Sequence, residues 1–186
     1  MDLIIYSNPS KNGFCGVILD QIVKILKRNK QEFEILDLYA MKYDPIVKLK
    51  ELNPKGGIIP SKDSIKIQEK ITTANRLIFI YPVWWGVMPA ILKGFIDRTI
   101  TAGFAYKFNS KHMPVGLLKK KALVFMTSGA PKLLLALSGN RPKKNIAKDI
   151  LGFCGIKTNV YQFGSSRNLN PQKEKNIRMK INKILK

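Results

Sequence analysis

The sequence predicts an α/β fold in which a doubly wound parallel sheet of five strands carries helices on both faces. Short apolar runs, typical of strands buried on both faces, alternate with longer segments whose apolar residues recur at helical spacing. The chain has 186 residues, of which 45% are hydrophobic. This length and composition predict one domain over residues 1–186 with one core.

Five segments carry the strand pattern. The first, Leu3–Tyr6, is a continuous apolar run that ends at a polar turn. The other expected strands are residues 33–38, 77–81, 122–126 and 160–163. Leu3–Tyr6 and residues 77–81 are continuous apolar runs, as in strands that are buried on both faces.

Helices are expected after each strand. They cover residues 14–29, 63–75, 90–98 and 142–155, and a last helix starts at residue 170. Capping residues mark several ends: Asp63 or Ser64 before the second helix, Pro89 and Pro142 at the starts of the next two, and Gly155 after the fourth. Right-handed crossovers then give the strand order 2-1-3-4-5, with a ligand expected at the carboxyl ends of the first and third strands.

The first of these ends is the turn Ser7-Asn8-Pro9-Ser10-Lys11-Asn12-Gly13. It presents hydroxyls, amides, a lysine and the amino end of a helix, and such a place binds phosphate because unpaired N–H groups and the helix dipole favour an anion. An ordinary capped turn is the alternative interpretation. The turn is neither a Gly-x-Gly-x-x-Gly motif nor a Walker loop, so a nucleotide triphosphatase is not supported.

The second end, residues 81–89, is less usual because Trp84 and Trp85 are adjacent in a loop framed by prolines. A flat apolar wall beside backbone amides suits a conjugated heterocycle. Core packing is the alternative, but two consecutive residues cannot both face one core. We therefore interpret the tryptophans as part of a binding site.

Several motifs together resemble the NAD(P)H quinone dehydrogenase family, which includes the bacterial modulator-of-drug-activity and potassium-efflux ancillary reductases and has a flavodoxin-like fold. The strongest are Pro82-Val83-Trp84-Trp85, Met88-Pro89-Ala90-Ile91-Leu92-Lys93-Gly94-Phe95-Ile96-Asp97-Arg98 and Gly103-Phe104-Ala105-Tyr106. Residues 37–40, 43–45 and 127–129 extend the similarity over nearly the whole chain. The resemblance implies a flavoprotein oxidoreductase that passes hydride from NAD(P)H through flavin to a quinone, nitroaromatic or azo acceptor by a ping-pong mechanism.

FMN is the favoured cofactor and FAD the alternative, because the first turn can hold one phosphate and no residue pattern is specific for adenine. The resemblance also implies which residues bind this flavin. The phosphate group is surrounded by Asn12, Gly13, Phe14 and Cys15, with Asn8 and Ser10 in the same turn. The ring lies against Pro82, Val83, Trp84 and Trp85, and its site is completed by Thr127, Ser128 and Gly129. In a homodimer with shared active sites, Tyr106 and Phe108 wall the neighbouring subunit's pocket.

The chain departs from this family in ways that leave catalytic residues unassigned. Asn8 replaces a frequent histidine, Gly13-Phe14-Cys15 replaces Ser-Phe-Asn, and the loop after Gly129 lacks the Tyr and His that stand beside the acceptor in other members. His112, the only histidine, is a candidate proton donor, although a solvated loop residue is the simpler interpretation. No Cys/His cluster has metal-ligand spacing, so no metal site is expected.

The charge is the main compositional anomaly, since 33 Lys+Arg against 12 Asp+Glu give a formal net charge of +21. A positive field attracts anions, and a solvated lysine-rich surface, a phosphorylated cofactor and nucleic acid are the alternatives. No helix-turn-helix or zinc signature accompanies the charge, which disfavours a nucleic-acid-binding module. A flavodoxin-type electron carrier remains the other alternative, although such carriers are usually acidic.

A cytoplasmic location is expected. Cys15 and Cys154 are interpreted as free thiols of a reducing compartment, and the first residues lack a secretory signal pattern. The longest uncharged run, residues 77–92, is interrupted by prolines and slightly short for a membrane helix, so no membrane partner is expected.

Overall fold

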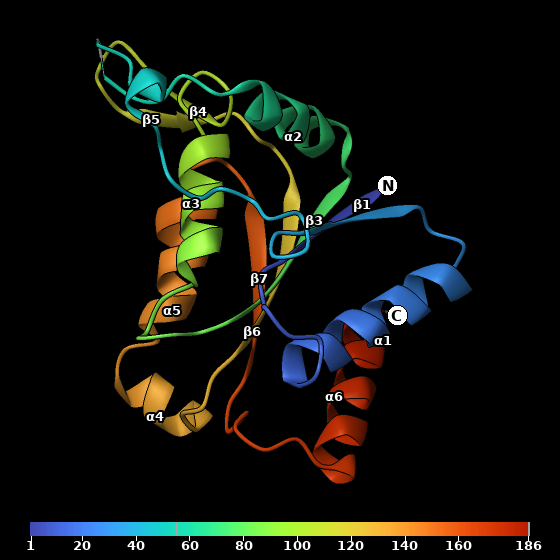
Figure 1. The fold of residues 1–186 in the computed structure, drawn as a ribbon. Helices are drawn as coiled ribbons and strands as arrows, with labels where there is room; N and C mark the ends of the chain where they lie inside the picture. Colours follow the sequence, from blue (N-terminus) through green and yellow to red (C-terminus); the bar gives the residue numbers. More distant parts are fainter. Residues whose placement is uncertain (55, 186) are drawn as a thin grey trace.

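The computed structural model describes residues 1–54 and 56–185, and at its centre is a five-stranded parallel sheet (Figure 1). The strands run in the order β2-β1-β3-β6-β7, which confirms the predicted order of the five main strands. Their bounds are β1 (Asp2–Tyr6), β2 (Phe33–Asp37), β3 (Arg76–Pro82), β6 (Lys121–Thr127) and β7 (Lys157–Phe163).

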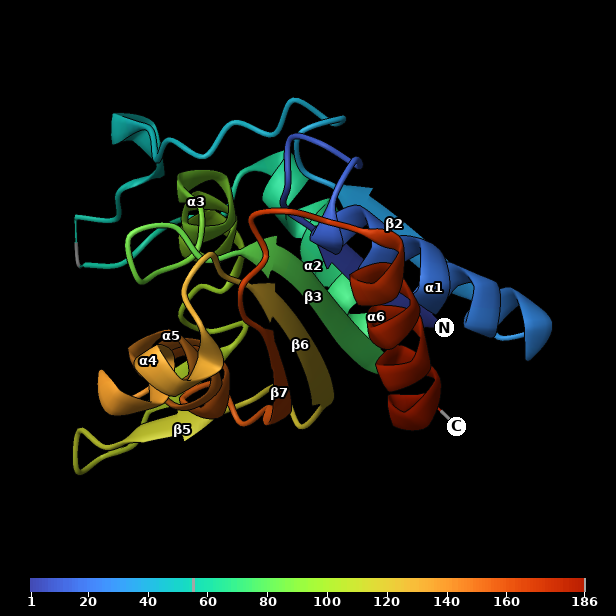
Figure 2. The same cartoon turned by 90° about the horizontal axis from the view of Figure 1, so that it is seen from below.

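Helices cover both faces of this sheet, as Figures 1 and 2 show. One face carries α1 (Phe14–Arg28) and α6 (Pro171–Ile184). The other carries α2 (Lys62–Thr73), α3 (Ala90–Thr99) and a helical segment made of α5 (Arg141–Lys144) and a π-helical stretch (Asn145–Gly152). None of the helices in the described part of the chain has the length and apolar character needed to cross a bilayer.

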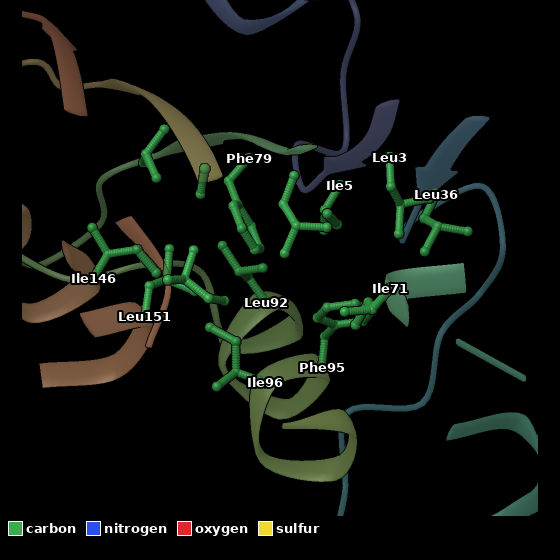
Figure 3. Packing of buried hydrophobic residues seen from close by; sticks show 14 of the residues in the cluster. Leu3, Ile5, Leu36, Ile71, Phe79, Leu92, Phe95, Ile96, Ile146 and Leu151 are labelled. Atoms are coloured by element: carbon green, nitrogen blue, oxygen red, sulfur yellow. The ribbon is translucent and has the colours of Figure 1, made fainter. Parts of the chain in front are cut away.

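The sheet separates two apolar cores because successive side chains of a strand point to opposite faces. Leu3 and Ile5 of β1 pack with Phe79, Leu92 and Phe95 on the α3 side (Figure 3). The alternate residues of the same strand pack against α1 and α6. Leu3–Tyr6 of β1 are buried on both faces of the sheet, which explains their continuous apolar run.

Some local predictions were wrong. The cap of α2 is Ser61, whose Oγ accepts a hydrogen bond from the Ser64 N–H, rather than Asp63 or Ser64. The segment predicted as one helix over residues 142–155 is instead α5 followed by the π-helical stretch. Its widened turns place Ile146 and Leu151 in the core, and Gly155 follows with a φ of 83°.

Three small elements lie outside the prediction. A 3₁₀ turn (Leu49–Glu51) interrupts the long connection after β2, and α4 (Lys132–Leu137) follows β6. The strands β4 (Tyr106–Phe108) and β5 (Pro114–Gly116) form an antiparallel hairpin beside the main sheet. Each is too short to give a periodic sequence pattern.

Candidate functional site

A cleft of about 380 Å³ lies at the carboxyl edge of the sheet, where the ligand was expected. The strand register puts the ends of β1, β3, β6 and β7 side by side at this edge. The cleft is lined by Asn8, Ser10, Asn12, Gly13, Phe14, Cys15, Pro82, Val83, Trp84, Thr127, Ser128, Gly129, Ser166, Arg167 and Leu169. Every predicted site residue is therefore brought together here except Trp85, Tyr106 and Phe108.

Internal hydrogen bonds hold the first turn in shape. The Tyr6 hydroxyl donates to the Ser10 carbonyl at 2.8 Å, and Ser10 Oγ accepts from the Asn12 N–H at 3.0 Å. Asn8 Oδ1 accepts from the Ser10 N–H at 3.3 Å. These bonds occupy the N–H groups of Ser10 and Asn12 within the turn, so the main backbone donors toward a ligand are expected at the start of the following helix.

The start of α1 provides such donors. Gly13 occupies the N-cap position and makes no side-chain cap, so the N–H groups of the first helical turn stay unpaired by a cap. No atom lies within 4 Å of the position that a Cβ would take at Gly13, which leaves open space beside the helix start. This is the geometry in which a helix N-terminus receives a phosphate.

The turn lies directly on the helix because residue 16 is glycine. A Cβ at Gly16 would stand 1.7 Å from the Lys11 carbonyl oxygen, a distance that no side chain can occupy. Lys11 itself pairs with Asp37 at 3.1 Å. The contact between Gly16 and the Lys11 backbone therefore holds the turn against the helix. The Lys11 side chain extends to Asp37 at the end of β2 and not to the helix start.

Cys15 joins the first turn to the end of β6. Its Sγ lies 3.3 Å from Thr127 Oγ1, and both side chains are buried. Burial raises the pKa of the Cys15 thiol, and the hydrogen bond from Thr127 only partly opposes this change. Cys15 is therefore a buried free thiol, and a reactive thiolate is disfavoured.

The two tryptophans form an exposed turn. Trp84 and Val87 exchange backbone hydrogen bonds of 2.9 and 3.0 Å, and the residues between them, Trp85 and Gly86, have φ values of 50° and 79°. Positive φ at both central positions is the pattern of a type I′ turn. Trp84 is 44% exposed and Trp85 101% exposed, so the prediction that they are not core residues is confirmed.

Trp84 lines the cleft itself, and Trp85 lines a neighbouring hollow. That hollow has a volume of about 790 Å³ and includes Val87, Leu135, Arg141 and Lys144. The turn thus separates two concave surfaces, one toward the first turn and one toward α4 and α5.

The β7–α6 loop closes the cleft with residues that the sequence analysis missed, namely Ser166, Arg167 and Leu169. The Ser166 N–H donates to the Ser128 carbonyl at 2.9 Å, and the Arg167 side chain crosses Gly129, with Nε 3.2 Å from the position of a Cβ there. The strand order could have revealed this loop, because it places the end of the last strand at the same edge.

Tyr106 and Phe108 lie away from this cleft, on β4. Their rings make edge contacts with Phe153, at centroid distances of 4.8 and 6.5 Å. Phe108 is nevertheless 58% exposed. His112 is exposed in the turn between β4 and β5 and does not line the cleft.

Another hollow, of about 490 Å³, lies between α2 and the connection after β2. It is larger than the cleft and smaller than the hollow that Trp85 lines. Several cations line it, of which Lys70 pairs with Glu34 and Arg98 pairs with Glu51. It lies apart from the start of α1 and from the tryptophans, and the helix start that lines it, that of α2, is capped by Ser61, so it lacks the uncapped helix start and the tryptophan wall of the cleft. Within residues 1–54 and 56–185, no three His, Cys, Asp or Glu side chains are grouped so that they could hold a metal ion.

Comparisons with known proteins agree with this geometry. The guinea-pig (Cavia porcellus) protein named NAD(P)H dehydrogenase (quinone) 1 is 32% identical over 83% of this chain and 64% of its own length. A Haemophilus influenzae protein named an uncharacterized NAD(P)H oxidoreductase is 40% identical over 69% of this chain and 64% of its own length. The chain therefore spans less than two thirds of the length of these curated relatives.

Among solved structures, a Streptococcus mutans protein superposes with a TM-score of 0.84 at 30% identity, covering 100% of this chain and 98% of its own. A family model described as a flavodoxin-like fold matches residues 3–186. Together with the strand order and the cleft at the sheet edge, this match shows that the chain belongs to the Flavodoxin_2 family of flavodoxin-like folds.

Proposed function

We propose that this chain is a flavin-dependent NAD(P)H oxidoreductase that reduces quinone-type acceptors. One observation carries the proposal: a single cleft has an uncapped helix start at one end and an exposed tryptophan turn at the other. The first suits a phosphate and the second a flat aromatic ring. The names of the guinea-pig and Haemophilus relatives support the same chemistry.

The phosphate end would be held by backbone groups. The N–H groups at the start of α1, which no side chain caps, favour a dianion there, as does the dipole of a 15-residue helix. FMN fits better than FAD for two reasons. The cleft of about 380 Å³ is near the small end of the usual range for ligand sites, about 300–1,000 Å³. In addition, its lining residues offer one phosphate-binding turn.

The ring end would be walled by Pro82, Val83 and Trp84 on one side and by Thr127–Gly129 on the other. A bound flavin supplies the hydride-accepting chemistry, and the chain orients it and leaves one face open. Arg167 places a guanidinium beside Gly129, where it would stabilise negative charge on a reduced ring.

Donor and acceptor would use the same open face in turn, which gives ping-pong kinetics. The exposed Trp85 would contact whichever flat molecule occupies that face. Quinones are the favoured acceptors because of the relatives' names, and nitroaromatic and azo compounds have the same flat shape.

The test is the identity of the cofactor and the fate of NAD(P)H. The flavin that is purified with the protein should be FMN, as mass spectrometry of the released cofactor would show. The protein, supplied with FMN or FAD if it is colourless, should oxidise NAD(P)H rapidly when a quinone is added. Flavin binding without NAD(P)H oxidation would favour an electron carrier. Absence of flavin binding together with salt-dependent binding of a DNA duplex would favour a nucleic-acid-binding module.

We also propose a homodimer in which each active site draws on both subunits. Its support is the β4–β5 hairpin, which exposes 58% of Phe108, 60% of Met113 and 37% of Val115. An exposed apolar group of this kind is typical of an interface, and a two-fold partner would cover it on both copies. Phe108 would then reach the partner's cleft, while Tyr106 supports it from within.

A further inference from the structure

The connection between β7 and α6, residues 164–170, forms one side of the cleft and is called the closing loop below (Figure 2). It supplies Ser166, Arg167 and Leu169 to the lining. Its first limb is fastened to the residues after β6 by backbone hydrogen bonds of 3.1 and 2.9 Å, which the N–H groups of Ser165 and Ser166 donate. The closing loop is thus tied to the sheet at one end.

Lys173 of α6 holds the other limb of the closing loop. Its Nζ donates to the Asn168 carbonyl at 2.9 Å and to the Ser165 carbonyl at 3.2 Å. Within residues 1–54 and 56–185, no other hydrogen bond reaches residues 167–169. These three residues are also exposed, so little packing would hold them if the bond from Lys173 were lost.

The start of α6 directs the Lys173 side chain toward the loop. Asn170 is the N-cap of this helix, and its Oδ1 accepts a hydrogen bond from the Lys173 N–H at 2.8 Å. Helical side chains lean toward the N-terminus of their helix, so a lysine in the first turn extends back along the segment that precedes the helix.

The same ammonium group reaches the start of α1. Lys173 Nζ lies 5.9 Å from the centroid of the Phe14 ring, which is within the range of a cation–π contact. Phe14 is the first residue of α1 and lines the cleft. The neighbouring carboxylate of Glu174 pairs with Arg178 at 2.7 Å and leaves Lys173 to these contacts. Lys173 therefore joins the closing loop to the helix start at the other side of the cleft.

We propose that Lys173 is a positioning residue that keeps the closing loop over the cleft and thereby slows the release of a bound flavin. A hydrogen bond from a charged donor is stronger than a neutral one, and here it fixes the backbone of the loop itself. Without it the loop would open more often, because few other contacts oppose opening. The effect on flavin rests on the proposed function, whereas the loop contact does not.

Hydrogen exchange of the flavin-free full chain tests the loop contact. Lys173→Met removes the ammonium group and keeps an unbranched side chain of similar helix propensity. Exchange of the Ser165 and Ser166 amides should become about tenfold faster, as expected for the loss of one hydrogen bond. Exchange in the main sheet and the Tm should stay near those of the parent, which a general loss of stability would not allow. Lys173→Arg should restore most of the protection.

Lys175→Met is the matched control, since it removes the same charge from an exposed position on the same helix. Its exchange at Ser165 and Ser166 should equal that of the parent. Unchanged exchange in Lys173→Met, or equally fast exchange in Lys175→Met, would overturn the proposal.

The rate of flavin release tests the consequence for the cleft. Lys173→Met loaded with FMN should release it about tenfold faster than the parent, in line with the more frequent opening of the loop. Riboflavin, which has no phosphate, should show a similar ratio, because the loop would cover both flavins. A loss confined to FMN would mean that Lys173 acts as a charge on the phosphate, and the positioning role would be wrong. A chain that binds neither flavin would refute the proposed function and the effect on release, while hydrogen exchange would still decide the loop contact.

Discussion

At the scale of single residues, Trp85 is the most informative position. Its side chain is 101% exposed, and its backbone has a φ of 50°, a conformation that bulky side chains avoid. A large apolar side chain in a strained, solvated turn contributes nothing to the core. Such strain is typical of positions where function outweighs stability.

We expect Trp85→Asn to fold as well as the parent or slightly better. Asparagine tolerates the left-handed conformation, which costs other residues about 1–2 kcal/mol. Flavin affinity or acceptor reduction should fall about three- to tenfold, the contribution of one aromatic contact. Thermal unfolding and flavin titration measure the two effects, and Trp85→Phe should retain most of the binding. A markedly lower unfolding temperature for Trp85→Asn would mean that the side chain is structural.

A second residue-scale prediction concerns Gly16. Gly16→Ala should displace the first turn, because a Cβ there would stand 1.7 Å from a backbone oxygen of Lys11. Both stability and flavin affinity should fall, although alanine is the better helix former by about 1 kcal/mol. The comparison is Gly129→Ala, whose Cβ would meet the flexible side chain of Arg167 at 3.2 Å. The free energy of unfolding of Gly129→Ala should match that of the parent. Equal losses of stability in Gly16→Ala and Gly129→Ala would contradict the explanation that the backbone contact at Gly16 causes the effect.

At the scale of elements, Arg98 of α3 holds the long connection between β2 and α2 through an ion pair with Glu51 and a hydrogen bond to the Asp44 carbonyl. Glu51 and Arg98 have side chains that are 6% and 11% exposed, with oxygen and nitrogen 2.6 Å apart. The connection can lie so close because residue 94 is glycine, where a Cβ would meet the Pro45 carbonyl oxygen at 2.2 Å. The connection between β2 and α2, whose sequence has no regular pattern, is thus held by buried contacts at Glu51 and Gly94.

Glu51→Gln should therefore destabilise the protein by about 3 kcal/mol near neutral pH, since it removes the carboxylate that neutralises a buried guanidinium, which keeps its hydrogen bond to the Asp44 carbonyl. The hydrogen bond from Arg98 lowers the pKa of Glu51, so the stabilisation is complete above the ordinary glutamate pKa of about 4.3 and is lost as the pH falls through the lower folded value. Urea unfolding of parent and variant should differ at pH 7 and converge in acid. The exposed pair Lys93–Asp97 is the control, and Lys93→Gln should change stability by less than about 0.5 kcal/mol.

At the scale of the whole molecule, shared active sites can be tested by subunit exchange. Trp85→Asn and Phe108→Ala should each be impaired as homodimers, and mixing them under exchange conditions should restore part of the activity. Each heterodimer would contain one site with both native side chains. Phe108 is preferable to Tyr106 because it is 58% exposed, so its truncation disturbs less packing. A fully active monomer at assay concentration would contradict the shared site.

The net charge of +21 leads to a prediction about the donor. Added salt should raise the apparent KM for NAD(P)H, because the range of the field shortens to about 10 Å at about 0.1 M. A dihydronicotinamide donor without phosphate groups is the control, and its KM should stay constant. Initial rates at low and high salt give the KM values of both donors. A KM for NAD(P)H that does not change with salt would mean that the positive charge does not assist donor binding.

The sequence by itself determined the main sheet and most of the candidate site. Strands such as β1 are buried on both faces, so their apolar runs are visible locally, and their alternation with amphipathic helices leaves few possible topologies. Parallel strands end at one edge, which brought the turn Ser7–Gly13, the tryptophan segment and Thr127–Gly129 to one cleft. The double tryptophan was interpreted as part of a binding site because adjacent residues cannot both face one core.

Only the tertiary structure decided the remaining features. Arg167 reaches the cleft because its loop is held over Gly129, and α4 and the β4–β5 hairpin are too short to have a periodicity of their own. Within one chain, Phe108 packs beside Phe153, whereas Trp85 lines the hollow toward α4 and α5. An active site that uses both side chains would therefore need a second copy of the chain. The physical reason is common to all of these: their conformations depend on contacts between distant segments, whereas a local pattern records only which residues are buried.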